Sequence, residues 1–380
     1  MNIGYITKQD PNDKKAYSGT HVNMLQALRS NFEEVSILGP VDLNYKIIPK
    51  IKGRVLRALS KKVYKYQYDT ALAKKSAKVI DRRIEIDKPD ALLASLMSPE
   101  VAYLESKIPF YITTDATFPL LNEMYNSHSN LHPLSIKEAL ALEKRAFERA
   151  TKLILPLKWL ADSAMKEYGV SSKKIEVIPY GCNLEHKLNS EEIDSVIRSR
   201  MEARQINLLF VGVRWEEKGG PFAVEVLREL LGLGLNAKLT IAGCTPQIPD
   251  LPSHVNIVGF LDKTVQAESE RLTGLYEKAS FFIMPTKAEC VGMSFIEAAS
   301  MALPAIGTNV GGVQEAVIHE KTGFIIKEAS SAKVAAEWVR KTWDDEKEYE
   351  QISRASYQKY SEVMNWETWG KKVKEIIADQ

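Results

Sequence analysis

The sequence lacks the features that mark secreted, membrane-spanning or nucleic-acid-binding proteins. It has 3 cysteines in 380 residues, Cys182, Cys244 and Cys290, without a CxxC pair. Such sparse cysteines exclude a disulfide framework and favour a reducing compartment. No window is long and apolar enough to span a bilayer, and the first residues show no signal-peptide pattern. A net charge of +2 does not argue for a nucleic-acid partner. We therefore expect a cytoplasmic protein that binds no nucleic acid.

Motifs that would hold a dinucleotide or a metal are absent as well. The first apolar segment, Asn2–Thr7, is not followed by G-x-G-x-x-G, and no D-x-D occurs anywhere in the chain. His128 and His132 are four residues apart, as in some metal sites. They have no third candidate ligand nearby in the sequence, so we interpret both as surface or loop residues.

The sequence does contain a regular alternation of apolar strand candidates and helical segments. It runs to Gly181, pauses in a polar stretch and restarts at Ile206. This predicts an α/β protein with two doubly wound, Rossmann-like domains. We divide the chain into an N-terminal domain (1–183), a linker with room for a helix (184–205), a C-terminal domain (206–362) and a final helix (363–380). Trp366 and Trp369 give the final helix apolar anchors, and we expect it to return to the N-terminal domain.

The stretch Pro285–Val317 carries the most specific site signal. A strand candidate leads into a loop with Glu289, then a glycine turn, then a helix with Glu297. Free N–H groups and the positive end of a helix attract a phosphate at such a turn. Carboxylates beside it accept hydrogen bonds from hydroxyls, and a nucleotide-sugar has both groups. The amides of the predicted anion site belong to Gly292, Met293 and Ser294.

The region from Lys46 to Arg83 is rich in basic residues. Apolar residues recur in it at helical spacing: Val55, Leu56, Leu59, Val63 and Tyr66. The pattern predicts a basic amphipathic helix. Two alternatives stay open for this helix. Either Lys46–Tyr66 makes a peripheral contact with an anionic membrane, or the apolar stripe packs on its own domain beneath a solvated basic face.

Two segments have the pattern of a helix capping box. Ser135-Ile-Lys-Glu138 predicts the start of a helix that runs to about Ala150. Ser294-Phe-Ile-Glu297 has the same pattern. Glu297 therefore has two alternative roles, as a cap of its own helix or as a carboxylate that binds a ligand.

Taken together, these segments resemble the retaining glycosyltransferases of family 4, which belong to group 1 and have the GT-B fold. Glu289 and Glu297 match the family's E-x7-E motif, and Gly311-Gly312-x-x-Glu315 matches the turn that follows it. The segment LFVGVRWEEKG, at 209–219, resembles the family's G-R-x-x-x-x-K-G loop. The likeness is close in the C-terminal domain and loose in the N-terminal one.

The resemblance implies two domains that face each other across a cleft, with the acceptor on the N-terminal side. It implies transfer of a hexosyl group from a nucleotide-diphospho-sugar to an acceptor hydroxyl, with retention of configuration. It places Lys218 at the donor phosphates, Glu289 at the transferred sugar and Glu297 at the ribose. Gly19 and Thr20, where the first helix begins, would approach the donor phosphates or the acceptor.

The sequence departs from the family pattern at two positions. The expected arginine of the lysine loop is Val213, and Arg214 follows one place later. Neighbouring side chains of a strand point to opposite faces of the sheet, so within a strand Arg214 would face away from the side of the expected arginine. Arg214 can therefore bind the donor only if the strand ends before it. In the N-terminal domain, Asp115 stands where many members have a functional histidine. We take Asp115 as a candidate catalytic residue.

The leaving diphosphate needs stabilisation as its charge develops. Without a D-x-D motif, we expect Lys218, Arg214 and the helix N-terminus to supply it, with no metal and no other cofactor. A nucleotide-sugar 2-epimerase or a non-catalytic nucleotide-sugar-binding protein are the alternatives, and the two glutamates with Lys218 favour the transferase. The sequence does not specify the donor base or sugar, or whether the acceptor is a glycan, a lipid-linked molecule or a small molecule.

Overall fold

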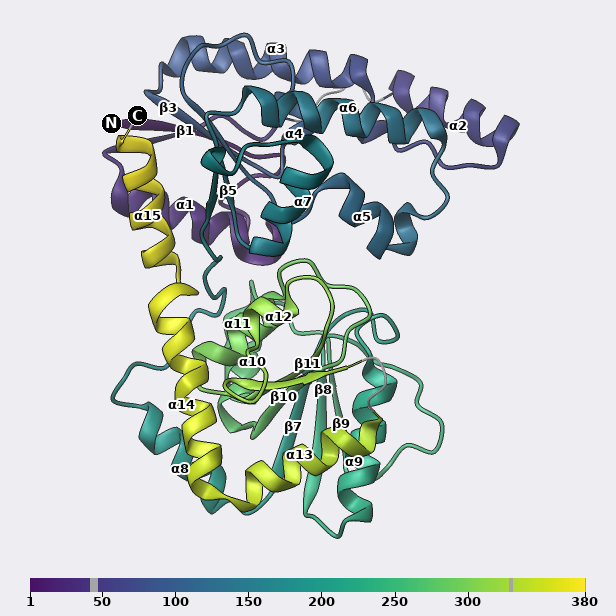
Figure 1. Cartoon of the computed structure of the whole chain (residues 1–380), viewed down its shortest axis with the longest axis vertical. Helices are drawn as coiled ribbons and strands as arrows, with labels where there is room; N and C mark the ends of the chain where they lie inside the picture. Colours follow the sequence, from purple (N-terminus) through teal and green to yellow (C-terminus); the bar gives the residue numbers. More distant parts are fainter. Residues whose placement is uncertain (42–46, 328–330, 380) are drawn as a thin grey trace. The chain divides into compact units, whose positions relative to one another are not determined.

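The computed structural model describes residues 1–41, 47–327 and 331–379, which divide into two compact units. Unit 1 comprises Met1–Tyr180 and Trp366–Gln380, and unit 2 comprises Gly181–Asn365. Each unit contains a six-stranded parallel sheet flanked by helices (Figure 1). The predicted α/β fold class with two doubly wound sheets is therefore confirmed.

The sheet of unit 1 has the strand order β2-β1-β3-β4-β5-β6. Its strands are β1 (Asn2–Ile6), β2 (Glu34–Ile37), β3 (Ala91–Ser95), β4 (Phe110–Thr113), β5 (Lys152–Leu155) and β6 (Ile175–Val177). The central strands are continuous apolar runs because helices cover both faces of a parallel sheet. In β3, all residues are buried.

Eight α-helices and four 3₁₀ turns are described in unit 1. The α-helices are α1 (Thr20–Asn31), α2 (Ile47–Ser60), α3 (Thr70–Asp87), α4 (Ser98–Val101), α5 (Phe118–Met124), α6 (Pro133–Arg149), α7 (Lys158–Tyr168) and α15 (Trp366–Ala378). The 3₁₀ turns are η1 (Ala16–Gly19), η3 (Tyr66–Tyr68), η4 (Asn126–His128) and η5 (Ser172–Lys174). The helices α3 and α6 lie on one side of the sheet, and α1 and α15 lie on the other (Figure 1).

The last helix, α15, packs against α1, which confirms that the C-terminal helix returns to the N-terminal domain. The backbones approach so closely that a Cβ atom on Gly370 would lie 2.9 Å from the carbonyl oxygen of Ala27. Trp369 is fully buried, and the ring of Trp366 stacks on Tyr180 with 5.7 Å between the centroids. The two predicted tryptophan anchors therefore hold the helix in unit 1.

The sheet of unit 2 has the order β12-β11-β10-β7-β8-β9. Its strands are β7 (Ile206–Val211), β8 (Ala237–Ala242), β9 (Val255–Gly259), β10 (Phe281–Met284), β11 (Ala305–Thr308) and β12 (Gly323–Ile326). Its helices are α8 (Ile193–Glu202), α9 (Gly220–Gly232), α10 (Gln266–Lys278), α11 (Met293–Ser300), α12 (Val313–Ala316), α13 (Ala332–Asp344) and α14 (Glu346–Val363). The chain leaves β7 in one direction across the sheet and returns through β10 in the other, so the order reverses between β7 and β10.

Residues 184–205, which we expected to form a linker, lie inside unit 2. They include α8, whose Arg200 is buried. The guanidinium group of Arg200 donates hydrogen bonds to four backbone carbonyls where α10 and α11 end, those of Tyr276, Glu277, Met301 and Ala302. This one side chain joins α8 to both helices.

The predicted basic helix exists as α2, but it is placed differently along the sequence. It ends at Ser60, so Val63 and Tyr66 follow the helix instead of extending its stripe. Leu56 is half-buried, while Ile47 and Ile48 at the helix start are exposed. Lys46 lies outside the described residues.

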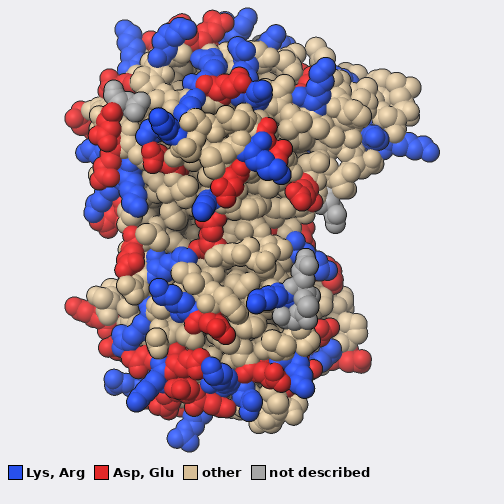
Figure 2. All heavy atoms as spheres, in the orientation of Figure 1, with Lys and Arg blue, Asp and Glu red and all other residues tan. Residues whose placement is uncertain are grey.

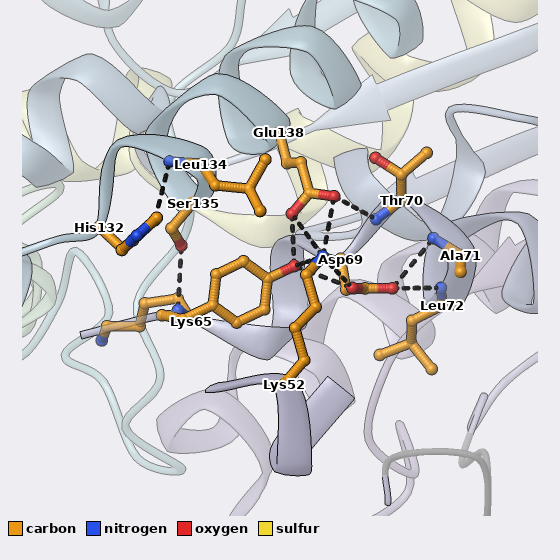
Figure 3. A network of polar contacts seen from close by, with 11 residues as sticks. Lys52, Lys65, Asp69, Thr70, Ala71, Leu72, His132, Leu134, Ser135 and Glu138 are labelled. Atoms are coloured by element: carbon orange, nitrogen blue, oxygen red, sulfur yellow. Dashed lines mark hydrogen bonds and ion pairs between the residues drawn. The ribbon is translucent and has the colours of Figure 1, made fainter. Parts of the chain in front are cut away.

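The capping box expected at Ser135 is wrong. The helix α6 begins at Pro133, and the Nδ1 atom of His132 caps it by accepting a hydrogen bond from the Leu134 N–H at 3.1 Å. The hydroxyl of Ser135 instead accepts from the Lys65 N–H, and Glu138 turns towards Lys52 (Figure 3). In the described part of the chain, no helix is long and apolar enough to cross a membrane.

Candidate functional site

The candidate site of unit 2 lies at the carboxyl ends of β7 and β10, the pair of strands where the sheet order reverses. In open α/β sheets, ligands bind outside the carboxyl ends of the strands at such a switch point. The loop after β7 carries Lys218, and the loop after β10 carries Glu289. The topology therefore brings together two residues that are 71 positions apart in the sequence.

The turn before α9 positions Lys218 against the end of β10. Gly219 has a φ of +77°, and a Cβ atom there would lie 1.9 Å from the carbonyl oxygen of Pro285. Only glycine fits this approach. The two loops are also joined by a hydrogen bond of 2.8 Å from the Lys287 N–H to the Glu217 carbonyl. The backbone thus fixes Lys218 before any side chain contributes.

Lys218 and Glu289 form an ion pair that is largely shielded from solvent. The Nζ atom of Lys218 lies 2.8 Å from Oε2 of Glu289 and 3.0 Å from the carbonyl oxygen of Ala288. The side chains of the pair are 10% and 14% exposed. A positive and a negative group, each reachable at the edge of the sheet, can bind an anion and a hydroxyl-rich group side by side.

Arg214 lies outside this pair. Strand β7 ends at Val211, so the alternation of sides that would have turned Arg214 away no longer applies. Its side chain is about half exposed, and its guanidinium group pairs with Glu217 at 3.1 Å. The strand therefore ends before Arg214, as its predicted role requires, and Arg214 pairs with Glu217 in the same loop.

The helix α11 begins at the predicted glycine turn. Gly292 is its N-cap residue with a φ of +77°, and no side chain caps this end. The N–H groups of the first turn have no partners within the helix. A Cβ atom on Gly292 would lie 3.4 Å from Cγ of Glu289, so the helix start adjoins the ion pair. Met293 and Ser294, in the first turn, are half-buried.

The capping role considered for Glu297 is wrong. Ser294 lies inside the helix and its hydroxyl contacts the sulfur of Met284, so no capping box forms. Glu297 is 3% exposed and pairs with Lys263 through Oε1. Its Oε2 atom accepts a hydrogen bond of 2.9 Å from the hydroxyl of Tyr276. No local pattern in the sequence indicated Lys263 or Tyr276, because they lie 34 and 21 positions away from Glu297 on other segments.

The candidates of unit 1 gather at the carboxyl ends of β1 and β4. Asp115 follows β4 and accepts a hydrogen bond from the hydroxyl of Tyr17, which lies in the loop after β1. Tyr17 and Ser18 have φ values of +51° and +54°, a conformation that costs energy for residues with side chains. Gly19 follows with a φ of +87° as the N-cap of α1, and Thr20 is buried.

A tyrosine–histidine cluster supports this loop and was not predicted. The ring of Tyr17 lies 5.4 Å from that of His21, whose Nδ1 atom is 3.2 Å from the hydroxyl of Tyr5. Burial lowers the pKa of His21 to about 4, so this ring is neutral near pH 7. The described residues include no group of three His, Cys, Asp or Glu side chains arranged to hold a metal ion.

Comparison with known proteins relates unit 2 to sugar-transferring enzymes. Residues 194–359 match the family described as glycosyl transferases group 1. Glycogen synthase of Mycobacterium tuberculosis is 32% identical over 170 residues, which cover 42% of this chain. The match spans only 39% of that enzyme's length.

Two further comparisons extend over the whole chain. The putative teichuronic acid biosynthesis glycosyltransferase TuaC of Bacillus subtilis is 22% identical over 369 residues, 93% of this chain and 90% of that protein. The crystal structure of HepE from Anabaena in complex with UDP and glucose is similar with a TM-score of 0.64. It covers 100% of both chains at 14% identity, which shows a shared fold.

Proposed function

We propose that the protein is a glycosyltransferase, because residues 194–359 match the family described as glycosyl transferases group 1. It moves a sugar from a nucleotide-diphospho-sugar to an acceptor hydroxyl. The observation that carries this proposal is the shielded pair of Lys218 and Glu289 beside the start of α11, at the switch point of the sheet. The family match favours sugar transfer over the two alternatives, which would bind the same donor.

Each group of the site suits one part of the donor. The ammonium group of Lys218 and the first N–H groups of α11, from Met293 and Ser294, bind the diphosphate. Glu289 accepts hydrogen bonds from the transferred sugar once the phosphates have taken over Lys218. Glu297 accepts from the ribose, which displaces the partly exposed Lys263. The UDP in the HepE complex supports a nucleotide as the ligand class for this fold.

The transfer proceeds with retention of configuration and without a metal. The acceptor oxygen forms its bond to the anomeric carbon on the face from which the diphosphate leaves. The bond between that carbon and the phosphate oxygen breaks, and this oxygen takes the proton of the acceptor hydroxyl. Lys218 and the start of α11 stabilise the charge that develops on the diphosphate, with Arg214 as a further cation near the loop.

The acceptor groups belong to unit 1 in this proposal. Asp115 lies at the end of β4, and Gly19 and Thr20, proposed to approach the donor phosphates or the acceptor, lie at the start of α1. Asp115, held by Tyr17, accepts a hydrogen bond from the acceptor. A glycan, a lipid-linked molecule or a small molecule with a free hydroxyl would fit this description, and the protein would act in the cytoplasm with a peripheral membrane contact.

A donor screen tests the proposal. The purified protein is incubated with a panel of nucleotide-sugars and EDTA, and released nucleotide is measured. We expect release with at least one donor in the presence of EDTA. Replacing Glu289 by Gln should lower the rate about 100-fold, the typical loss when one polar contact to a transition state is removed. Glu225→Gln, a change of the same kind at an exposed position on α9, should leave the rate unchanged.

Three outcomes would contradict the proposal. Absence of binding of every nucleotide in calorimetry would exclude a donor site. Binding without release in the presence of varied acceptors would favour a non-catalytic binding protein. A donor recovered with an inverted sugar C2 would indicate the 2-epimerase.

A further inference from the structure

The helix α2 turns an apolar stripe outward from unit 1. The stripe consists of Ile47, Ile48, Ile51, Val55 and Leu59, each between 52% and 80% exposed. With 3.6 residues per turn, these five side chains fall within about a third of the helix circumference. A contiguous apolar patch of this kind marks an interaction surface on a globular protein, unlike single exposed apolar residues.

A row of basic side chains runs beside the stripe. It consists of the exposed residues Lys50, Arg54 and Arg57, and Lys61, also exposed, follows the end of the helix. The sequence from 47 to 65 contains no Asp or Glu at all. In the space-filling view, the outer end of unit 1 where α2 lies is tan with Lys or Arg at its edge, and no acidic side chain is visible there (Figure 2). The solvent-facing side of α2 is therefore apolar along one line and cationic along the next.

Lys52, at the edge of the stripe away from the basic row, fastens the helix to unit 1. Its Nζ atom donates hydrogen bonds to Asp69 at 2.8 Å, to the hydroxyl of Tyr64 at 2.7 Å and to Glu138 at 3.3 Å (Figure 3). Gly53, the next residue, also faces Tyr64: a Cβ atom there would be in ordinary contact with the Tyr64 carbonyl oxygen, at 3.4 Å.

This network fixes which way the stripe points. Asp69 caps α3 by accepting from two N–H groups, and Glu138 lies on α6, so two helices hold the one lysine. Burial disfavours the charged form of Asp69, yet hydrogen bonds from Lys52 and Tyr64 outweigh it and lower the pKa of this carboxyl. Rolling the stripe inward would break the ion pairs of Lys52 with Asp69 and Glu138.

We propose that α2 is a membrane-surface helix whose apolar stripe enters the headgroup region of an anionic lipid bilayer. The basic row then lies at the level of the lipid phosphates, which is the arrangement of interfacial amphipathic helices. Charge complementarity selects this occupant. A protein partner or a second copy would need acidic groups against the row, and α2 itself offers none. The proposal does not depend on the donor chemistry.

Vesicle sedimentation with matched variants tests this surface. The full-length protein is mixed with phosphatidylcholine vesicles, with or without phosphatidylglycerol. Ile48→Asp is compared with Ile86→Asp on α3, because these isoleucines are 71% and 77% exposed and the changes are chemically identical. We expect Ile48→Asp to lower binding to anionic vesicles at least about tenfold and Ile86→Asp to leave it within about twofold.

A second pair of variants tests the charge. Arg54→Glu/Arg57→Glu should abolish binding to anionic vesicles, whereas Lys78→Glu/Arg82→Glu, exposed on α3, should weaken it only slightly. Equal effects within either matched pair, or equal binding to neutral vesicles, would overturn the proposal. A dimer in buffer that Ile48→Asp dissociates would assign the stripe to a second copy instead. Nucleotide release measured without vesicles separates failure of this proposal from failure of the proposed transferase.

Discussion

At the scale of single residues, the two glutamates of the motif differ because of their neighbours. Glu289 lies in a loop and pairs with Lys218, at a position where solvent still reaches both side chains. Glu297 lies on a helix and is almost fully buried between Lys263 and Tyr276. In the proposed function both carboxylates exchange a lysine for hydroxyls of the donor, but Glu297 is the more deeply buried of the two and depends more on its partners for stability.

Lys263→Met should therefore destabilise unit 2. It leaves the Glu297 carboxylate buried without its cation, which typically costs about 3 kcal/mol. The double variant Lys263→Met/Glu297→Gln removes the charge as well and should recover most of this loss. Urea unfolding of the wild type, both single variants and the double variant gives the coupling energy. Additive effects of the two changes would show that the pair contributes no coupling.

A buried carboxyl in unit 1 predicts a pH dependence of stability. Glu143 on α6 accepts hydrogen bonds from the Phe118 N–H at 2.7 Å and the Tyr168 hydroxyl at 2.6 Å. Burial raises its pKa from 4.5 to about 7, although these hydrogen bonds act in the opposite direction. The folded protein thus holds this proton more tightly than the unfolded chain. Its contribution to stability is full below pH 4.5 and is lost as the pH rises to about 7.

Glu143→Gln has no proton to lose and should remove this dependence. Relative to the wild type, the variant should gain up to about 3 kcal/mol in the free energy of unfolding between pH 5 and pH 8. Urea unfolding at the two pH values measures the difference. Glu148→Gln, an exposed change near the end of the same helix, is the control and should show no such gain. A parallel pH profile of wild type and Glu143→Gln would contradict the assignment.

At the scale of elements, α8 shows how a polar stretch can form part of a core. Its composition suggested a linker, yet Arg200 reaches four carbonyls where α10 and α11 end. Carbonyls at a helix C-terminus lack partners in the helix and attract cations. Since α11 carries Glu297, the hydrogen bonds of Arg200 to the end of α11 help to hold the candidate site in place.

Arg200→Lys should destabilise unit 2, because α10 and α11 depend on the hydrogen bonds of Arg200. Lysine keeps the charge but cannot reproduce the fork of guanidinium donors, so several buried carbonyls lose their partner. We expect a loss of about 3 kcal/mol in urea unfolding. Arg198→Lys, on the same helix but exposed, should change stability by less than about 0.5 kcal/mol. Equal stability of the two variants would show that Arg200 is not a structural clamp.

Most element types followed from the sequence, while several boundaries and caps did not. Continuous apolar segments such as β3 and β10 indicate strands of a parallel sheet, because helices cover both faces of such a sheet. The capping patterns at Ser135 and Ser294 failed, since a histidine ring and a glycine occupy the N-cap positions. A four-residue pattern does not fix where the first turn of a helix begins.

At the scale of the whole molecule, both ends of the chain lie in unit 1. The strand β1 pairs at the N-terminal end, and α15 covers α1 at the C-terminal end. Unit 1 is therefore complete only when the last residues of the chain have folded onto it. Unit 2 is continuous in sequence.

A chain that ends at Asn365 should show this asymmetry. Without α15, the amides of α1 should exchange with deuterium at least about tenfold faster, because α1 loses the helix that packs closely on it at Gly370. The amides of β7 and β10 in unit 2 should keep their protection. Lys372→Ala, exposed on α15, is the control and should leave α1 unchanged. Unchanged exchange in α1 of the shortened chain would show that α15 does not stabilise unit 1.

The sequence alone determined the features encoded by local periodicity and by short spacings. The alternation of strands and helices fixed the two doubly wound sheets, and the tryptophans of the last helix indicated its return to unit 1. The glycine turn with Glu289 and the loop with Lys218 could each be found as a separate segment, because the residues of each motif lie within a few positions of one another in the sequence.

Only the tertiary structure decided which distant residues meet. The order β10-β7 in the sheet joins Lys218 to Glu289, and the loop before α10 supplies Lys263 to Glu297. The ion pairs of Lys52 with Asp69 and Glu138 determine that the stripe of α2 faces outward. These pairings depend on strand order and helix packing, which no local pattern in one sequence records.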